Sequence, residues 1–117
     1  MTLIYHITRR AAWQRALQRG EYRTPSLRTE GFIHCSGRTQ VVRVANAFYR
    51  GRRNLVLLVV DPAEVQAPLR HERVDGGRFP HIYGPLNLDA VVQVVEFPPR
   101  ADGTFAFPGN SSSSRSS

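Results

Sequence analysis

The sequence predicts an α+β protein in which two helices pack against a mixed or antiparallel β-sheet. Three observations support this class. Apolar residues recur at helical spacing in two segments of the first half of the chain. Residues 55–60 form an unbroken apolar run, which is typical of a central strand buried on both faces. Strand signals dominate from residue 62 onward, and the order β-α-β-α followed by mostly β is typical of α+β folds.

The first half of the chain supplies both helices. Residues 2–7 alternate with β-favouring side chains and predict a strand, and residues 9–19 predict a helix. Residues 21–30 predict a loop that leads into a strand over GFIHCS, residues 31–36. Residues 39–49 predict the second helix. We expect its packed side to carry four residues, Val41, Val44, Ala45 and Phe48.

The second half of the chain predicts strands. The sequence DGG at residues 75–77 is typical of a hairpin turn between a strand at 69–74 and an extended segment at 78–85. A last apolar strand is expected over residues 89–97. We therefore expect a single domain over residues 1–98. Residues 99–117 are rich in Pro, Gly and Ser, so they are expected to add little core and to be disordered at their end.

Cysteine content and the N-terminal sequence indicate the cellular compartment. The single cysteine, Cys35, excludes an internal disulfide framework, so we expect a reducing, cytoplasmic environment. Cys35 itself is expected to point into the core. No segment has the pattern of a signal peptide or approaches about 20 consecutive apolar residues, so no membrane partner is expected. We expect a monomer.

The net charge of +7 is carried by arginine alone, because the chain contains no lysine. Two interpretations remain open: a solvated basic surface, or a surface that binds a phosphate-bearing ligand or nucleic acid. For nucleic acid, the candidate contacts are four arginines on the second helix and just after it, Arg43, Arg50, Arg52 and Arg53.

Three short segments each place a histidine and a polar residue on the same side of a strand, because side chains alternate with a period of two. These pairs are His6 with Thr8, His34 with Ser36, and His81 with Tyr83. Two interpretations of each histidine remain open: an ordinary polar residue of a strand, or part of a ligand site. The repetition of the pattern favours a shared site at which the three imidazoles meet.

The chemistry of such a site follows from the residue types. His34 and Ser36 can hydrogen-bond a ligand hydroxyl or act as base and nucleophile, although no Gly-x-Ser-x-Gly motif is present. Tyr83 can stack on a planar ring, or it can pack with Phe79. Glu72 is the best carboxylate candidate, whereas His71 is expected to be exposed. Three histidines can hold zinc, but their spacing matches no local ligand motif, so no metal is expected.

Four segments resemble a known family in order and spacing. They are IYHIT, SLRTEGFIHCS, QVVRVANAFYRGRRNLVLLVVDP and FPHIYGPLNLDAVV, and together they identify the chain as a member of the small bacterial proteins called domain of unknown function 952. The resemblance covers about residues 2 to 98. It also implies a fold similar to the ADP-ribosyltransferase-like superfamily, whose members bind NAD in the cleft of a split β-sheet.

This second resemblance implies roles for the site residues. Residues 5–8 resemble the Tyr-His-Gly-Thr signature of the poly-ADP-ribose polymerase and diphtheria-toxin branch, in which the histidine holds a ribose hydroxyl; Ile7 replaces the glycine. His81 stands where transferases that modify proteins carry a glutamate, which is closer to the RNA 2′-phosphotransferase branch. The implied ligand is NAD or a related small nucleotide. His34 and His81 would be catalytic. The cofactor-binding residues would be His6, Thr8, Ser36 and Tyr83.

Two other classes of function remain open at this point. The chain can be a non-catalytic module that binds a small molecule or a protein, or it can bind nucleic acid through its arginine-rich helices. Ligand binding without product formation indicates the first class, and salt-dependent retention on RNA or DNA indicates the second.

Overall fold

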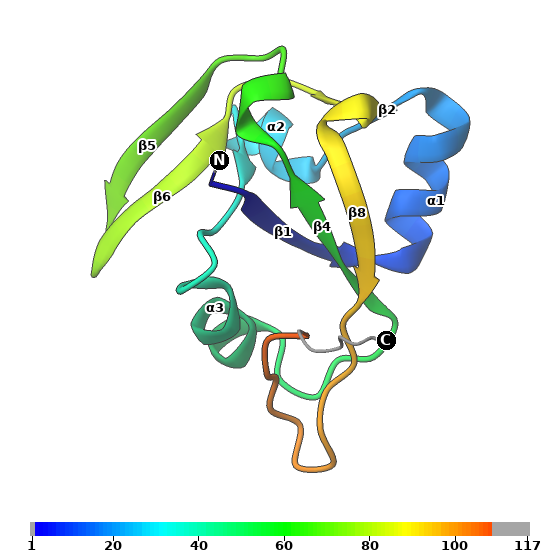
Figure 1. The fold of residues 1–117 in the computed structure, drawn as a ribbon, viewed down its shortest axis with the longest axis vertical. Helices are drawn as coiled ribbons and strands as arrows, with labels where there is room; N and C mark the ends of the chain where they lie inside the picture. The colour runs from blue at the N-terminus through cyan, green and yellow to red at the C-terminus, as the bar shows by residue number, and fades with distance from the viewer. Residues whose placement is uncertain (1, 109–117) are drawn as a thin grey trace.

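The structure, a computed structural model, describes residues 2–108 of the chain (Figure 1). The fold is α+β, as predicted, but the described residues contain three α-helices where two were expected. The helices are α1 (Arg10–Arg19), α2 (Pro25–Thr29) and α3 (Val41–Phe48). The extra helix, α2, lies where a loop was predicted. Pro25 suits its first turn, because a missing N–H costs nothing at that position.

The central sheet has three antiparallel strands in the order β1-β4-β8. Their bounds are Ile4–Arg9, Leu55–Val60 and Val91–Glu96. All six residues of β4 are buried, as the apolar run predicts. Val56, Leu58 and Val60 belong to one hydrophobic cluster, and the alternate residues of β4 belong to the other. The strand is therefore buried on both faces and organises the whole core.

The first and third helices cover opposite faces of this sheet. Ala16 of α1 belongs to the first hydrophobic cluster, whereas Val41 and Ala45 of α3 belong to the second. Helix α1 ends at Gly20, whose φ of 92° suits a glycine cap. The expectation that Phe48 packs against the core is wrong, because 73% of this residue is exposed. No helix within residues 2–108 has the length and apolar character needed to cross a membrane.

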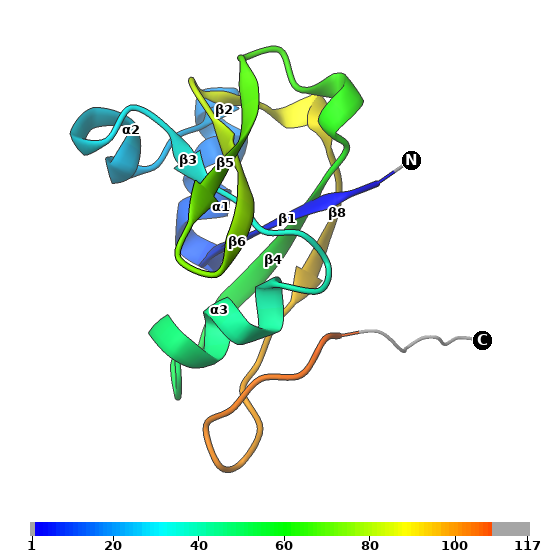
Figure 2. The same cartoon turned by 90° about the vertical axis from the view of Figure 1, so that its left-hand side faces the viewer.

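A second three-stranded sheet lies beside the first and carries the candidate site (Figure 2). Its order is β3-β6-β5, with β3 at Ile33–His34, β5 at Leu69–Val74 and β6 at Gly77–Ile82. The predicted hairpin is present: β5 and β6 pair up to Val74 and Gly77, and Gly76 has a φ of 85° in the turn.

The segment after β3 connects the two sheets. The Cys35 amide donates a hydrogen bond to the Pro80 carbonyl, and Ser36 then pairs with Tyr5 of β1 through two backbone hydrogen bonds of 2.8 Å. Residues 33–36 thus pair first with β6 of the second sheet and then with β1 of the central sheet. The two sheets are therefore the two parts of one split sheet. A third pair, β2 (Glu21–Tyr22) with β7 (Leu86–Asn87), and two 3-10 turns, η1 (Pro62–Glu64) and η2 (Leu88–Ala90), complete the fold.

The expectation that residues beyond Pro98 add little core is wrong for the described part of that segment. Phe105 is 1% exposed and its ring centroid lies 4.9 Å from that of Phe97, the residue that follows β8. The Phe105 amide donates to the Asn46 side chain of α3, which fixes this segment on the second hydrophobic cluster. The predicted disorder at the end of the chain falls on residues 109–117, which lie outside the described residues.

Candidate functional site

Strand pairing brings two of the three predicted histidines together. His34 of β3 and His81 of β6 are direct partners in the antiparallel register, so their side chains lie on the same face of the sheet. Their ring centroids are 5.4 Å apart, with the ring planes at 70°. His34 is exposed, whereas His81 is only 4% exposed. The two imidazoles therefore adjoin each other, one open to solvent and one covered.

Phe32 covers His81 and joins the pair to Tyr83. The Phe32 ring stacks on the His81 ring at a centroid distance of 4.0 Å and an interplanar angle of 18°. It also lies 4.7 Å from the His34 ring and 5.2 Å from the Tyr83 ring. These aromatic contacts fix the positions of the two imidazoles. We call the surface formed by Glu30, Phe32, His34, Glu72, His81 and Tyr83 the histidine face.

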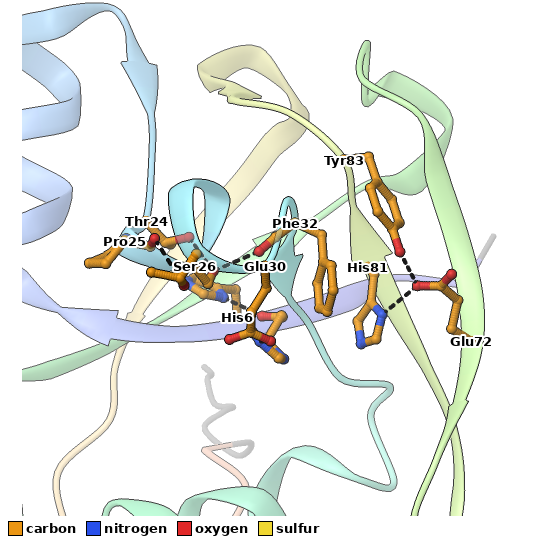
Figure 3. A network of polar contacts seen from close by, with 11 residues as sticks. His6, Thr24, Pro25, Ser26, Glu30, Phe32, Glu72, His81 and Tyr83 are labelled. Atoms are coloured by element: carbon orange, nitrogen blue, oxygen red, sulfur yellow. Dashed lines mark hydrogen bonds and ion pairs between the residues drawn. The ribbon is translucent and has the colours of Figure 1, made fainter.

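Glu72 of β5 orients His81 and Tyr83 with a single carboxylate oxygen (Figure 3). His81 Nδ1 lies 2.8 Å from Glu72 Oε1, and the Tyr83 hydroxyl donates to the same oxygen at 2.5 Å. The bond from Tyr83 and, after it, the bond from His81 lower the pKa of Glu72, and the carboxylate in turn raises the pKa of Tyr83. Glu72 is thus an ionised acceptor, which requires the proton of neutral His81 to lie on Nδ1.

Glu30 orients His34 through the Nε2 atom of its ring, whereas Glu72 orients His81 through Nδ1. The Glu30 Oε1 atom lies 3.0 Å from His34 Nε2, and both side chains are about half exposed, at 49% and 54%. A carboxylate only accepts hydrogen bonds, so the proton of neutral His34 lies on Nε2. Within residues 2–108, neither His34 Nδ1 nor His81 Nε2 has a hydrogen-bond partner. Each imidazole therefore keeps one nitrogen available to accept a proton.

The third histidine, His6 of β1, lies behind this face and not on it. It is buried; its Nδ1 donates to the His34 carbonyl at 2.5 Å, and its Nε2 accepts from the Tyr22 hydroxyl at 2.7 Å. Burial lowers the pKa of His6 to about 4, although the bond to the His34 carbonyl works in the opposite direction. Burial also raises the pKa of Tyr22, so that residue remains a donor. His6 is a neutral link that holds the backbone of His34.

The predicted site residues thus divide into two groups. His34, His81 and Tyr83 meet on the histidine face. The structure contradicts the expectation that all three imidazoles open onto one pocket. Besides His6, the buried group contains Thr8, which is 9% exposed on β1, and Ser36, which is 6% exposed where it pairs with Tyr5. His34 and Ser36 do not share a site, because β3 ends at His34 and Ser36 already pairs with Tyr5 of the central sheet.

Two residues of the histidine face were missed by the sequence analysis. Phe32 precedes His34 by two positions, so the period of a strand places both on one side, and Glu30 precedes His34 by four. The Tyr83 ring, for which packing with Phe79 was one expectation, lies next to the Phe32 ring. Glu72, the carboxylate favoured from the sequence, does contact His81.

The other candidate groups lie outside this face. Cys35 is buried in the first hydrophobic cluster as predicted, and burial raises the pKa of its thiol to about 12. His71 is exposed, also as predicted. Among residues 2–108 no group of three or more His, Cys, Asp or Glu side chains is arranged to hold a metal ion. The four candidate nucleic-acid contacts, Arg43, Arg50, Arg52 and Arg53, are all exposed on α3 and the loop that follows it.

The sequence matches the family described as "Protein of unknown function (DUF952)" over residues 7–94, about three quarters of the chain. The chain belongs to the DUF952 family. The matched span contains the whole histidine face, whereas His6 precedes it by one residue.

Solved structures agree with this assignment. The chain is similar to the crystal structure of protein CC0527 from Caulobacter crescentus, with 37% identity and a TM-score of 0.83 over 90% of this chain and 94% of that one. The solution NMR structure of CC0527 gives 39% identity and a TM-score of 0.78, over 89% of this chain and 91% of that one. No curated protein matches the chain. These matches establish DUF952 membership and carry no link to the ADP-ribosyltransferase-like superfamily, which stays a prediction.

Proposed function

We propose that this DUF952 protein binds NAD or a related nucleotide on the histidine face and that His34 and His81 act on it as an acid–base pair. One observation carries the proposal: the two histidines are cross-strand partners, and each has one ring nitrogen held by a carboxylate and the other without a partner among residues 2–108. Oriented imidazoles are the usual groups for proton transfer in enzymes.

The aromatic part of the face suits the ring of a nucleotide. Phe32 and Tyr83 are half-buried, so both aromatic side chains are partly exposed next to the histidines. The guanidinium of Arg70 lies 5.1 Å from the centre of the Tyr83 ring, so a positive charge borders the same surface. A ring on Phe32 or Tyr83 and a phosphate near Arg70 and the imidazoles would use both features.

The ribose contact implied by resemblance to ADP-ribosyltransferases does not fit this structure. Both ring nitrogens of His6 are bonded within the protein, so a ribose hydroxyl would have to displace the Tyr22 hydroxyl or the His34 carbonyl. Thr8 lies on β1 and Ser36 pairs with Tyr5 of the same strand, so both belong to the central sheet and not to the histidine face. The proposal therefore assigns ligand contact to His34, His81 and Tyr83, and assigns to His6 the role of positioning His34.

The pair can serve a transfer reaction in the usual general acid–base manner. One histidine takes the proton of an attacking hydroxyl on its free nitrogen, while the other, already protonated on its free nitrogen, gives that proton to a leaving oxygen. Transfer of ADP-ribose to a hydroxyl needs only the base, because nicotinamide leaves NAD as a neutral molecule. Transfer of a phosphate away from a ribose 2′-oxygen also needs the acid, because that oxygen leaves as a hydroxyl. His34 is the exposed member of the pair, so we assign to it the role of base toward the attacking group. We assign to His81, the covered member, the role of acid toward the leaving group.

Calorimetric titration with ADP-ribose tests binding. His34→Gln and His81→Gln each replace an imidazole that can carry a positive charge by a neutral amide. Each is expected to weaken binding about tenfold, because one hydrogen bond to the charged ligand loses its charge assistance. His71→Gln, which alters an exposed histidine of the same sheet, is the matched control and is expected to leave the affinity unchanged. If the native protein gives no binding heat at millimolar ADP-ribose, or if the three variants behave alike, the proposal fails.

Incubation with NAD and an RNA bearing a 2′-phosphate, followed by mass spectrometry, separates enzyme from binding module. A transferase is expected to release nicotinamide, and His34→Gln or His81→Gln is expected to abolish this release. Binding of ADP-ribose without any product would instead support the non-catalytic module.

Nucleic-acid binding is the second candidate, and one observation favours it. Within residues 2–108 the only arginines in ion pairs are Arg10 and Arg23, so Arg50, Arg52 and Arg53, which follow α3, form no ion pair. Their joint replacement by glutamine is expected to weaken salt-dependent retention on RNA. Retention that weakens equally in His34→Gln would contradict this candidate, because that residue lies on the histidine face.

A further inference from the structure

A cavity of about 580 Å³ lies between α1, β2 and α2. Its walls come from the face of α1 that carries Arg15 and Arg19, from residues 21–24, and from α2. The volume falls within the range of small-molecule sites in proteins, roughly 300–1,000 Å³. No residue of the histidine face lines it. The cavity is therefore a separate feature of the molecule, and we call it the arginine cavity.

Four arginines and one carboxylate line this cavity, so its lining is strongly basic. Arg15 and Arg19 lie one turn apart on α1 and so face the same way, Arg23 follows β2, and Arg28 belongs to α2. The carboxylate, Glu21, forms an ion pair with Arg23. Arg15, Arg19 and Arg28 have no ion pair within residues 2–108, where all nine acidic residues of the chain lie.

Unpaired guanidinium groups that share one cavity repel each other, and a bound anion relieves this repulsion. Guanidinium also matches phosphate in shape, because its planar donors bind two oxygens at once. Three unpaired groups suit a ligand with two or more negative charges. A single inorganic anion would leave most of the cavity empty.

The remaining wall is apolar. Ala12 and Ala16 of α1, together with Pro25 and Leu27 of α2, line the same space, and Ala16 is buried. Such a surface suits a ring or a short carbon skeleton, whereas a bare phosphate gains nothing from it.

From these two observations we propose that the arginine cavity binds a small phosphorylated molecule that carries at least two negative charges and an apolar or planar body. The unpaired Arg15, Arg19 and Arg28 hold the phosphate groups, and the alanine and leucine side chains contact the body. This site is independent of the histidine face and uses none of its residues.

Binding of inorganic pyrophosphate, followed by amide NMR shifts of the full chain, tests the charge requirement. The largest shifts are expected in residues 15–29, while His34 and His81 stay unchanged. The double variant Arg15→Gln/Arg19→Gln is expected to raise the dissociation constant at least about tenfold, since two charge-assisted contacts are lost. Both residues are exposed, so the variant is expected to keep the native amide spectrum.

Two further variants make the result specific. Arg73→Gln/Arg78→Gln removes the same charge from exposed arginines of β5 and β6, and it is expected to change the constant less than about twofold. Glu21→Gln removes the competing carboxylate of Arg23, so binding is expected to strengthen several-fold. The proposal is overturned if millimolar pyrophosphate causes no shifts in residues 15–29, if both double variants weaken binding equally, or if Glu21→Gln weakens it.

Replacement of pyrophosphate by ADP tests the apolar wall in the same titration. ADP is expected to bind more tightly than pyrophosphate and to lose affinity in the same Arg15→Gln/Arg19→Gln variant. If ADP binds more weakly than pyrophosphate, the proposed contact with an apolar or planar body is wrong.

Discussion

The Nδ1 atom of His6 lies 2.5 Å from the carbonyl oxygen of His34. This bond joins β1 of the central sheet to β3 of the second sheet, directly behind the exposed imidazole of His34. A residue that the sequence marks as a ligand contact is therefore used to hold another site residue in place. Because His6 is buried and neutral, the bond has a consequence for stability that can be measured.

We predict that His6 makes the fold less stable in acid. Its pKa is about 4 in the folded protein and 6.5 when exposed. Between these values the unfolded chain binds the proton and the folded chain does not, so stability is complete above pH 6.5 and falls as the pH drops toward 4. The full loss is on the order of 3 kcal/mol. Urea unfolding at a series of pH values measures it.

The replacement His6→Gln is expected to remove this part of the pH dependence and to lower stability at pH 7 by about 1–3 kcal/mol through the lost hydrogen bonds. His71→Gln, at an exposed position, is the control and is expected to keep the native pH profile. A His6→Gln profile that is parallel to that of the native protein would show that His6 is not the responsible group.

Glu72→Gln is predicted to lower the pKa of Tyr83. The carboxylate that accepts the Tyr83 hydroxyl raises this pKa above 10.0, so its neutralisation is expected to bring the value back toward 10.0. The carbon shift of the phenol ring followed against pH by NMR gives the value directly. Glu64→Gln is the control, since the Glu64 side chain makes no contact with Tyr83. Equal Tyr83 titrations in the native and Glu72→Gln proteins would contradict the shared-carboxylate geometry.

Phe105→Ala is predicted to destabilise the protein by about 3–5 kcal/mol, because a buried aromatic ring leaves a cavity in the second hydrophobic cluster. Phe48→Ala makes the same chemical change at a residue that is 73% exposed, so a change within about 0.5 kcal/mol is expected. Denaturant unfolding of the two variants gives the comparison. Similar values for both would mean that the segment after Pro98 does not belong to the core.

Gly84→Ala is predicted to cost more stability than Gly31→Ala. Both glycines have positive φ values, 154° and 92°, so each alanine adds about 1–2 kcal/mol of backbone strain. Only at Gly84 does the added Cβ also meet another atom, 2.9 Å from the Ala67 Cβ. This contact is expected to add about 1–3 kcal/mol and to disturb the neighbouring Tyr83. Thermal unfolding compares the variants, and an equal loss in both would exclude the steric contribution.

Local patterns predicted the fold class and most of the strands. The apolar run at residues 55–60 corresponds to a strand buried on both faces, and DGG marks the observed hairpin turn. Patterns failed where tertiary contacts decide the outcome. Phe48 has the spacing of a packed residue, yet α3 ends there and leaves it exposed, whereas Phe105 lies in a segment of low apolar content and is buried.

The candidate site was predictable only in part for a related reason. The spacing of a histidine and a polar residue two positions apart gives the side of a strand on which the histidine lies, but not what that side faces. His34 and His81 became neighbours through strand register, a long-range property that no local spacing specifies. His6 has the same local pattern and faces the core, where Tyr22 and the His34 carbonyl satisfy it.

The central claim, that His34 and His81 act together on one ligand, is tested most directly by the imidazole nitrogen shifts of the two residues during titration with ADP-ribose. The account predicts that His34 Nδ1 and His81 Nε2 shift along one binding curve with one dissociation constant, while the nitrogens of His71 do not move. Imidazole signals of His34 and His81 that stay fixed at millimolar ADP-ribose, or that follow two different curves, would contradict it.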